Sequence, residues 1–278
     1  MSKGFVIVAS NAPRFAWYAH TLALSLLDFY PTAKIHLFTE KQFLPLIDKH
    51  FKNGTKIYDD IGYCNNAYRA KMLCCSKVNY DQVCYLDADM WINDEMISHV
   101  FDNLNDTDML WTKIREMSAA DHSWWDWRNG VRHPHGGFFV WNNSDKMKEF
   151  FKTWYEHFYE WHLVKSPEEW TEFSYTFEQR HWDQISLHAM LMNNNHRWYR
   201  PDIKWKWIDD YEDWRWNYID PHYEITYNYD PSKKIVNHYA KSSVDKTIDK
   251  IYNNVDVHMP EIFNYRRQVT NEDITDDY

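Results

Sequence analysis

The sequence predicts an α/β fold in which helices flank a mostly parallel β-sheet. Two observations support this prediction. Residues 4–10, GFVIVAS, form a continuous apolar run, the pattern of a strand buried on both faces of a parallel sheet. Strand-like runs and helical stretches then alternate over the first hundred residues. Because parallel strands need crossover connections, this alternation indicates a right-handed arrangement with helices covering the sheet.

The N-terminal elements follow from local patterns. Asn11-Ala12-Pro13 ends the first strand, and Arg14 to Tyr30 then repeats apolar residues with the helical period. The elements expected next are a strand at 34–39, a helix at 44–51, a short strand at 56–58, a helix at 66–78 and a strand at 82–86.

Beyond residue 103 the spacing changes. The elements expected there are a strand at 109–113, an aromatic loop at 121–135, a strand at 137–141, helices at 145–163 and 182–192, and a strand at 235–239. Residues 202–229 are dense in Trp and Tyr and poorly periodic, so we expect an aromatic-rich C-terminal elaboration. The absence of internal repeats and long linkers predicts one domain.

Composition excludes some classes of protein. The formal net charge of −10 argues against a general binder of nucleic acid or anionic membranes. The longest uncharged stretch, Phe15 to Leu27, is shorter than the roughly 20 residues of a membrane-spanning helix. A strand begins directly at Phe5 and Arg14 follows soon after, so a signal peptide is not expected and we predict a cytoplasmic location.

The cysteines fit that location. Cys64, Cys74, Cys75 and Cys84 lie close together without a CxxC spacing, so we interpret them as reduced, mostly buried thiols rather than a zinc site. Aromatic residues make up 18% of the chain, including 16 Trp. Their flat apolar faces and polar edges suit sugar rings as well as protein cores.

The most informative segment is Asp87-Ala88-Asp89, which follows an apolar strand and precedes a second apolar run. Two carboxylates one residue apart point roughly the same way at a strand end. Placing them side by side is costly unless a cation lies between them. A hard divalent cation takes such oxygen ligands and keeps positions open for phosphates, so we predict a metal–diphosphate site. The alternative is an acidic surface turn.

Three further motifs each have a functional and a structural interpretation. Gly136-Gly137 marks either a close approach of a ligand to the backbone or a tight loop. Asp183-Gln184 either grips sugar hydroxyls or caps a helix. His238, at a strand end three residues before Lys241, either completes the metal site or is structural. The chain has no Walker loop, GxGxxG, GxSxG or HExxH motif.

The order of these motifs resembles the GT-A glycosyltransferases of the glycogenin and lipopolysaccharide-galactosyltransferase type, commonly called family 8. The order is Ala9-Ser10-Asn11, Tyr68-Arg69-Ala70-Lys71, Tyr85-Leu86-Asp87-Ala88-Asp89, Gly136-Gly137-Phe138, Asp183-Gln184, and His238 with Lys241. The resemblance covers most of the chain, roughly residues 4–245. The chain departs from the family's late motif, because Lys241 comes early and no Pro-Trp follows.

The resemblance implies roles for these residues. Asp87, Asp89 and His238 would hold Mn²⁺ or Mg²⁺, which bridges the diphosphate of a UDP-sugar. Asp183 and Gln184 would be the catalytic residues that line the anomeric carbon and the sugar hydroxyls. The residues expected to bind the nucleotide sugar are Ala9, Ser10, Asn11, Arg69, Lys71, Asp87, Ala88, Asp89, Gly136, Gly137 and Lys241.

The expected function is therefore a metal-dependent transfer of a sugar from a UDP-sugar, with retention of configuration. We expect residues 1–103 to bind the nucleotide sugar, residues 104–269 to form the acceptor half, and residues 270–278 to be an acidic tail, all within one domain spanning 1–278. The acceptor would be a cytosolic glycan or other sugar-bearing molecule, or a hydroxymethylated base in phage DNA, with the host cytoplasm as location in that case. The sequence does not indicate an oligomeric state.

Two other classes remain open. One is a non-catalytic carbohydrate- or nucleic-acid-binding protein on the same scaffold. The other is a nucleotidyltransferase, which usually has a glycine-rich phosphate loop near its N-terminus, whereas Ser10-Asn11-Ala12-Pro13 contains no glycine.

The segment from His196 to Tyr218 interleaves basic and aromatic residues. They are Arg197, Arg200, Lys204, Lys206 and Arg215 among Trp198, Trp205, Trp207, Trp214 and Trp216. A sugar subsite, a nucleic-acid groove and plain core packing all fit this pattern. Five acidic residues in the same stretch balance the five basic ones.

Overall fold

The computed structural model describes residues 1–10, 13–44, 56–60, 67–113, 134–170, 177, 183–208, 216, 218–220 and 236–239. The chain forms two compact units, Met1–Ala240 and Lys241–Tyr278. Every described residue belongs to the first unit. The division into donor and acceptor halves and the acidic tail stay predictions.

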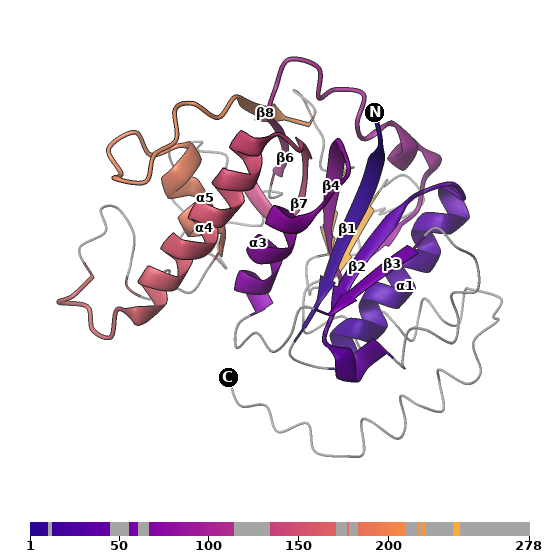
Figure 1. The fold of residues 1–278 in the computed structure, drawn as a ribbon, viewed down its shortest axis with the longest axis horizontal. Coiled ribbons are helices and arrows are strands. Elements are labelled where there is room, and N and C mark those ends of the chain that lie inside the picture. The colour runs from indigo at the N-terminus through magenta and orange to yellow at the C-terminus, as the bar shows by residue number, and fades with distance from the viewer. Residues whose placement is uncertain are drawn as a thin grey trace. The chain divides into compact units, whose positions relative to one another are not determined.

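A seven-stranded sheet forms the centre of the first unit, with strand order β3-β2-β1-β4-β7-β6-β8 (Figure 1). The strands are β1 (Lys3–Ala9), β2 (Ile35–Thr39), β3 (Lys56–Asp60), β4 (Gln82–Asp87), β6 (Met109–Lys113), β7 (Pro134–Asn142) and β8 (Trp205–Trp207). Neighbouring strands from β3 to β4 are parallel, and β7 runs antiparallel to both β4 and β6. The predicted mostly parallel α/β sheet is therefore confirmed.

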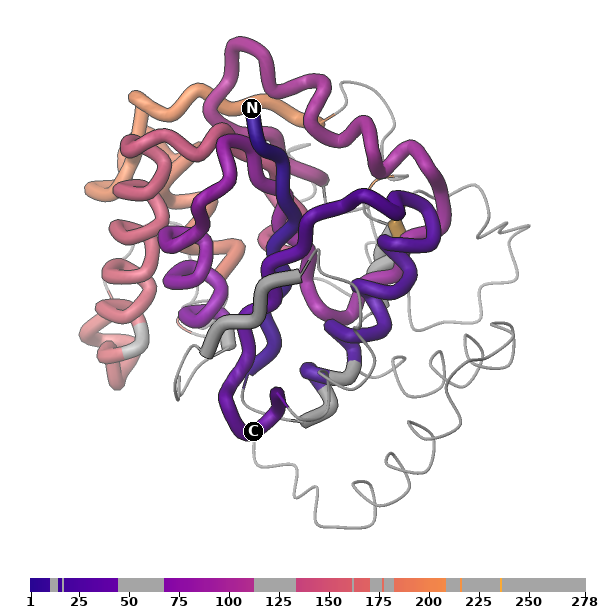
Figure 2. Tube along the Cα trace, turned by 45° about the vertical axis from the view of Figure 1, so that its right-hand side comes forward, coloured from indigo at the N-terminus to yellow at the C-terminus, as the bar shows by residue number. Residues whose placement is uncertain are grey.

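Helices cover both faces of this sheet. They are α1 (Pro13–Phe29), α3 (Ala67–Lys77), α4 (Asp145–Leu163) and α5 (Asp183–Leu191), with short 3₁₀ turns η1 (Lys41–Phe43) and η2 (Glu95–His99). Helices α3 and α4 pack side by side, and the turned view places α1 on the other side of the central strands (Figure 2). Helix α4 begins at its N-cap Ser144, whose hydroxyl accepts from the Met147 N–H.

Strand β1 is buried on both faces, as its apolar sequence predicts. Val6 and Val8 belong to the large core cluster under α3, α4 and α5. Phe5 lies on the other face and contacts Tyr30 and Phe101 edge-on. Alternate residues of one strand therefore serve two separate cores.

Aromatic rings dominate the core under α3 and α4. The Tyr85 and Phe139 rings stack with centroids 4.9 Å apart, and Trp111 lies 4.6 Å from Phe139. Trp154 on α4 donates its indole N–H to the Ser186 hydroxyl on α5 over 2.7 Å, which ties these helices together. Much of the high aromatic content is therefore core packing.

A small second sheet has the strand order β5-β10-β9. Its strands are β5 (Met90–Ile92), β9 (Tyr218–Asp220) and β10 (Val236–Tyr239). The Ser25 hydroxyl on α1 accepts from the Ile92 N–H and anchors β5. The sequence pattern predicted β10 but not β9, because three residues within an aromatic segment show no measurable period.

Most element bounds agree with the prediction within two residues. Strand β7 is longer than predicted, because pairing with β4 and β6 extends it from Pro134 to Asn142. The predicted helix at 44–51 and most of the loop at 121–135 lie outside the described residues, as do Cys64 and the tail from Thr270. Cys74, Cys75 and Cys84 are buried, in agreement with the prediction.

Candidate active site

The predicted site residues meet at the carboxyl ends of the parallel strands. Ala9 ends β1 and Asp87 ends β4, and the pairing of Val8 with Asp87 brings these two strand ends level. Helix α3, which carries Lys71, begins at the same edge because it leads back to the start of β4. The crevice outside this edge is the usual ligand-binding place of an open α/β sheet.

Asp87 and Asp89 lie at the turn between β4 and β5. The Asp87 side chain is 25% exposed, and its Oδ1 atom accepts a hydrogen bond from the Tyr85 hydroxyl at 2.7 Å. Ala88 between the aspartates is buried, and Asp89 is partly exposed. The Asp87 carboxylate is thus fixed by its own strand while remaining accessible to a ligand.

Lys71 lies at the centre of the site. Its buried ammonium donates to the Gly136 carbonyl at 2.8 Å and to Asp183 Oδ2 at 2.7 Å, and it lies 3.1 Å from Asp87 Oδ1. An ammonium has three donors, so these contacts occupy all of them. Lys71 therefore joins α3, β7, α5 and the end of β4 at one point.

Gly136 lets the backbone and a side chain approach closely at this junction. A Cβ atom at this position would lie only 2.5 Å from Asp183 Oδ2. The absence of a side chain lets the Asp183 carboxylate approach the backbone of β7 closely enough to share the Lys71 ammonium with the Gly136 carbonyl. The group that approaches the backbone of Gly136 in this structure is a carboxylate of the same chain, and the predicted approach of a ligand stays a prediction.

Asp183 both begins α5 and faces Lys71. It is buried, and its Oδ1 atom accepts from the Gln184 N–H at 2.9 Å. The Asp183 carbonyl accepts from the Ser186 hydroxyl at 2.7 Å. Oδ1 thus binds the backbone of the helix, as the capping interpretation predicts, while Oδ2 binds Lys71. The contact with sugar hydroxyls stays a prediction.

The electrostatics of the cluster follow from burial and close charges. Burial alone would lower the pKa of Lys71, but the carboxylates of Asp183 and Asp87 outweigh it and raise that pKa. Burial, with the charge of Asp87 second, also raises the pKa of Tyr85. Lys71 is therefore an ammonium and Tyr85 a neutral donor at physiological pH.

The carboxylates of the site suit a divalent cation in their charge and donor type. Three carboxylates (Asp87, Asp89 and Asp183) and one ammonium leave a net negative charge, which a bound cation would offset. Carboxylate oxygens are the donors that Mn²⁺ and Mg²⁺ prefer. Among the described side chains no group of three His, Cys, Asp or Glu residues is arranged to hold a metal.

The predicted third ligand, His238, has its backbone in β10. The antiparallel pairing of β10 with β5 places His238 opposite Met90, the residue after Asp89. The side chain of His238 lies outside the described residues, as do Asn11 and Lys241, so these three roles stay predictions.

Arg69 lies away from this cluster. Its guanidinium is stacked between the rings of Tyr155 and Tyr159 on α4, 4.4 Å and 4.2 Å from their centroids. Among the contacts between described residues, Lys71 joins Asp87 and Asp183, while Arg69 joins the two tyrosines of α4.

Two buried hydroxyls lie at the same edge of the sheet. Ser10 directly follows β1, Thr39 ends β2, and the register pairs Ala9 with Thr39. Within the described part of the chain, Ser10 Oγ and Thr39 Oγ1 have no hydrogen-bond partner. Buried polar atoms without partners are rare, so a ligand at these strand ends would satisfy them.

Sequence reasoning assigned no role to Tyr85. A signal existed, because residues two apart on a strand share a face, and Tyr85 precedes Asp87 by two positions.

The segment from residue 196 to 208 packs against the rest of the unit. Trp198 and Trp216 are buried, and Trp205 and Trp207 lie edge to face with centroids 5.1 Å apart while packing against the core. Lys204 and Lys206 are exposed on the other side of β8. The described tryptophans are therefore packing residues; Trp214 and Arg215 lie outside the described residues.

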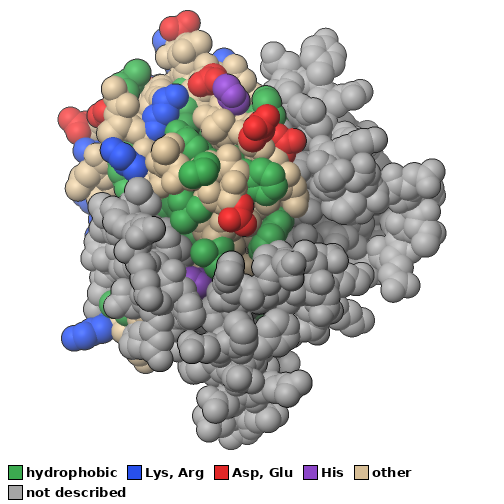
Figure 3. All heavy atoms as spheres, turned by 90° about the vertical axis from the view of Figure 1, so that its right-hand side faces the viewer, with side chains coloured by type: hydrophobic (Ala, Val, Ile, Leu, Met, Phe, Trp, Pro, Cys, Tyr) green, Lys and Arg blue, Asp and Glu red, His purple; other side chains and the backbone are tan. Residues whose placement is uncertain are grey.

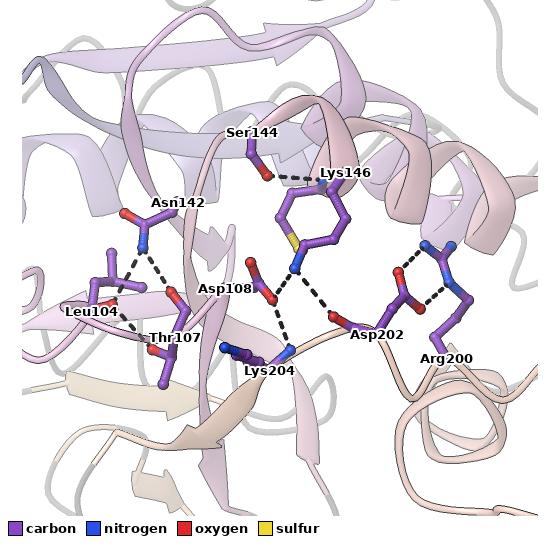
Figure 4. A network of polar contacts seen from close by, with 10 residues as sticks. Leu104, Thr107, Asp108, Asn142, Ser144, Lys146, Arg200, Asp202 and Lys204 are labelled. Carbon is purple, nitrogen blue, oxygen red and sulfur yellow. Dashed lines mark hydrogen bonds and ion pairs between the residues drawn. The ribbon is translucent and has the colours of Figure 1, made fainter.

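A polar network fixes the same segment (Figure 4). Asp108, before β6, accepts from the Lys146 ammonium on α4 and from the Lys204 N–H. Arg200 and Asp202 form two parallel hydrogen bonds of 2.8 Å. These pairs neutralise Arg200 and Lys146 within the protein, which leaves less charge for a nucleic-acid phosphate.

Comparison with known proteins gives a structural likeness only. No protein-family model matches the chain, and no curated protein matches it in sequence. The galactosyltransferase LgtC, solved in complex with donor and acceptor sugar analogs, is 14% identical over 95% of this chain and 99% of its own, with a TM-score of 0.56. Mouse xyloside xylosyltransferase 1 is 12% identical over 86% of this chain and 97% of its own, with a TM-score of 0.54.

The glycosyltransferase GlyE of Streptococcus pneumoniae TIGR4 is 14% identical over 96% of this chain and 65% of its own, with a TM-score of 0.55. The chain shares the fold of these glycosyltransferases. The predicted GT-A architecture and the resemblance to the lipopolysaccharide-galactosyltransferase type are confirmed at the level of fold. Of the described helices, none has the length and apolar character to cross a membrane.

Proposed function

We propose that this protein is a metal-dependent glycosyltransferase that moves a sugar from a UDP-sugar to an acceptor, with retention of configuration. The observation that carries the proposal is the junction of Asp87, Lys71 and Asp183 beside Asp89. It lies at the carboxyl edge of a fold shared with solved glycosyltransferases. Fold alone does not define an activity, so the chemistry of the site has to support it.

The nucleotide would bind at the ends of β1 and β2. The buried hydroxyls of Ser10 and Thr39 there are suited to hydrogen bonding with a nucleoside. Asn11 is the third residue that we assign to this part of the site.

Asp87 and Asp89 would hold the cation, with His238 as third ligand. When bound, Mn²⁺ or Mg²⁺ supplies the positive charge that stabilises a departing diphosphate. Tyr85 and Lys71 both contact Asp87 Oδ1, so they orient this carboxylate before any ligand arrives.

Lys71 positions the carboxylates of Asp87 and Asp183. Its three donors are used on Gly136, Asp183 and Asp87, so it aligns the two carboxylates rather than reaching a phosphate. Asp183 would stabilise the positive charge that develops at the anomeric carbon when the diphosphate leaves, and its burial strengthens that interaction. Gln184 would hold sugar hydroxyls, since an amide both donates and accepts.

Retention is consistent with attack of the acceptor from the face that the diphosphate leaves. In such a reaction the bond from the anomeric carbon to the diphosphate breaks, a short-lived oxocarbenium ion forms, and the acceptor oxygen bonds to it. The departing diphosphate oxygen would take the acceptor's proton, so no dedicated base is needed. Asp183 faces the cluster from the start of α5, where it could stabilise that ion.

A glycan or another sugar-bearing molecule is our preferred acceptor. LgtC, which has the same fold, was solved with an acceptor sugar analog. A hydroxymethylated DNA base is the second candidate, and the cytoplasmic location stays a prediction. On the described part of the face in Figure 3, acidic, basic and hydrophobic side chains are interspersed rather than gathered into a basic patch.

Calorimetry with UDP in the presence and absence of Mn²⁺ tests the proposal. The wild-type protein should bind UDP only with Mn²⁺, and Asp87→Asn should abolish that binding and turnover with little loss of fold. Asp106→Asn, which changes an exposed turn residue, is the matched control and should behave as wild type. A mass-spectrometric screen of UDP-sugars against glycans and 5-hydroxymethylcytosine DNA then identifies donor and acceptor.

Two outcomes would overturn the proposal. If Asp87→Asn kept nearly full metal-stimulated activity, Asp87 would not be a ligand of the catalytic metal. Sugar binding without UDP or Mn²⁺ would instead favour a non-catalytic carbohydrate-binding protein on this scaffold.

A further inference from the structure

Tyr68 is an exposed aromatic residue at the edge of the site. It stands in the first turn of α3, one turn before Lys71, and so at the same edge of the sheet as the end of β4. It keeps 44% of its surface exposed. Its ring is thus open to a ligand as well as close to Lys71.

Contacts on two sides fix the Tyr68 ring. The Phe158 ring of α4 meets it edge to face, with centroids 6.2 Å apart. The Lys71 ammonium, which binds Asp183 and Asp87, lies 5.7 Å from the centre of the same ring. The ring is therefore held against the ion cluster while part of its surface faces solvent.

The Tyr68 hydroxyl lies in the field of all three aspartates. Burial raises the pKa of Tyr68 to about 12, with the charges of Asp183, Asp87 and Asp89 adding to the effect and that of Lys71 opposing it. The raised pKa keeps the hydroxyl in its neutral form. It stays protonated and remains a hydrogen-bond donor at physiological pH.

We propose that Tyr68 is a substrate-contacting residue, which stacks its exposed ring on the transferred sugar and donates its hydroxyl hydrogen to that sugar. The inference rests on the proposed function, in which the diphosphate binds near Asp87 and Asp89 and the sugar lies toward Asp183. A sugar between these carboxylates would meet the Tyr68 side chain. Tyrosine suits this task, because its ring offers an apolar face and its edge a donor.

Tyr159 provides a matched control. It is also 44% exposed and also contacts a cation, the Arg69 guanidinium. It lies on α4, and the cation that it contacts, Arg69, is a different one from the Lys71 ammonium that binds Asp87 and Asp183. The two tyrosines thus share exposure and helix packing but differ in their relation to the aspartates.

The experiment measures hydrolysis of UDP-galactose and UDP-glucose with Mn²⁺, together with calorimetric binding of UDP alone, for the wild type, Tyr68→Phe, Tyr68→Ala and Tyr159→Ala. Tyr68→Phe should lower kcat/KM for the better donor about tenfold, because one hydrogen bond to the sugar is lost. Tyr68→Ala should lower it about a hundredfold, because the stacking surface goes as well. UDP carries no sugar, so its affinity should stay within about twofold in both variants.

Other outcomes distinguish a wrong role for Tyr68 from a wrong proposed function. Wild-type kcat/KM in both Tyr68 variants, or an equal loss in Tyr159→Ala, overturns the assignment while leaving the proposed function intact. An equal loss of UDP affinity also overturns it, because Tyr68 would then act on the nucleotide site or the fold. If the wild-type protein neither binds UDP with Mn²⁺ nor hydrolyses either donor, the proposed function is wrong. The role of Tyr68, which rests on it, is then wrong as well.

Discussion

The Lys71 ammonium lies 2.7 Å from Asp183 Oδ2, although the two residues are 112 positions apart in the sequence. Both side chains are almost fully buried, at 4% and 6% exposure. The pair connects the first half of the fold, which carries the Asp87 strand, with α5. The same contact that closes the fold therefore also assembles the candidate site.

Removing the Lys71 charge should destabilise the protein strongly. Lys71→Met leaves Asp183 and Asp87 buried or partly buried without their cation, and breaking such a pair typically costs about 3–5 kcal/mol. The free energy of unfolding from urea titration at pH 7 measures this loss. Lys77→Met, at the exposed end of the same helix, should change stability by no more than about 0.5 kcal/mol. A loss in Lys71→Met as small as that of the control would show that the pair contributes little.

A side chain at Gly136 should disturb the same pair. In Gly136→Ala the new Cβ would lie 2.5 Å from Asp183 Oδ2, so the carboxylate must move away from Lys71. Overpacking of this kind costs about 1–3 kcal/mol. The free energy of unfolding should fall by that amount, and Mn²⁺-dependent donor hydrolysis should fall with it.

A double-mutant cycle shows whether Asp183 is the cause. In an Asp183→Ala background the carboxylate is gone, so the additional cost of Gly136→Ala should fall to within about 0.5 kcal/mol. If Gly136→Ala destabilised the Asp183→Ala protein as much as the wild type, the new methyl group would clash with a group other than Asp183.

Local patterns were sufficient to predict the strands and the acidic turn. Strand β4 ends where its apolar run ends, so the position of Asp87 and Asp89 follows from residues 82–92 alone. The junction of Lys71, Gly136 and Asp183 could not be predicted in this way. It depends on which strands become neighbours, and the placement of β7 next to β4 is a property of the whole sheet.

The aromatic segment shows a different limit. The alternation of Lys204, Trp205, Lys206 and Trp207 predicts two faces, and the structure has the lysines exposed and the tryptophans packed. Sequence alone could not decide whether the aromatic face meets a ligand or the core, because both surfaces select the same side chains.

Charge reversal on the exposed face of β8 should leave the fold and the donor site unchanged. Lys204 and Lys206 are exposed, and the contact of Lys204 with Asp108 uses its backbone N–H. The double variant Lys204→Glu/Lys206→Glu should therefore keep its free energy of unfolding within about 1 kcal/mol and its UDP affinity within about twofold. Trp205→Ala, which removes a packed ring, should cost more than about 1 kcal/mol.

The same variant tests the nucleic-acid interpretation. If DNA were the acceptor and bound here, its affinity for the charge-reversed protein should fall and the salt dependence should weaken by about one unit per lost phosphate contact. If the salt dependence of DNA affinity were unchanged, Lys204 and Lys206 would not contact phosphates, and β8 would have only a structural role.

His188, on α5, should make the protein less stable in acid. Burial, with the charge of His196 second, lowers the pKa of His188 from 6.5 to about 4. The fold therefore favours the neutral ring, and this contribution to stability is fully present above pH 6.5. It is lost as the pH falls from 6.5 through about 4, because the unfolded chain takes up a proton that the folded protein resists. A shift of this size corresponds to about 3 kcal/mol.

His188→Gln removes the titrating group and keeps a polar side chain. Its free energy of unfolding should change less between pH 7 and pH 4 than that of the wild type, by about 3 kcal/mol. Urea titrations at several pH values give both slopes, and equal slopes for His188→Gln and the wild type would mean that another group carries the acid sensitivity.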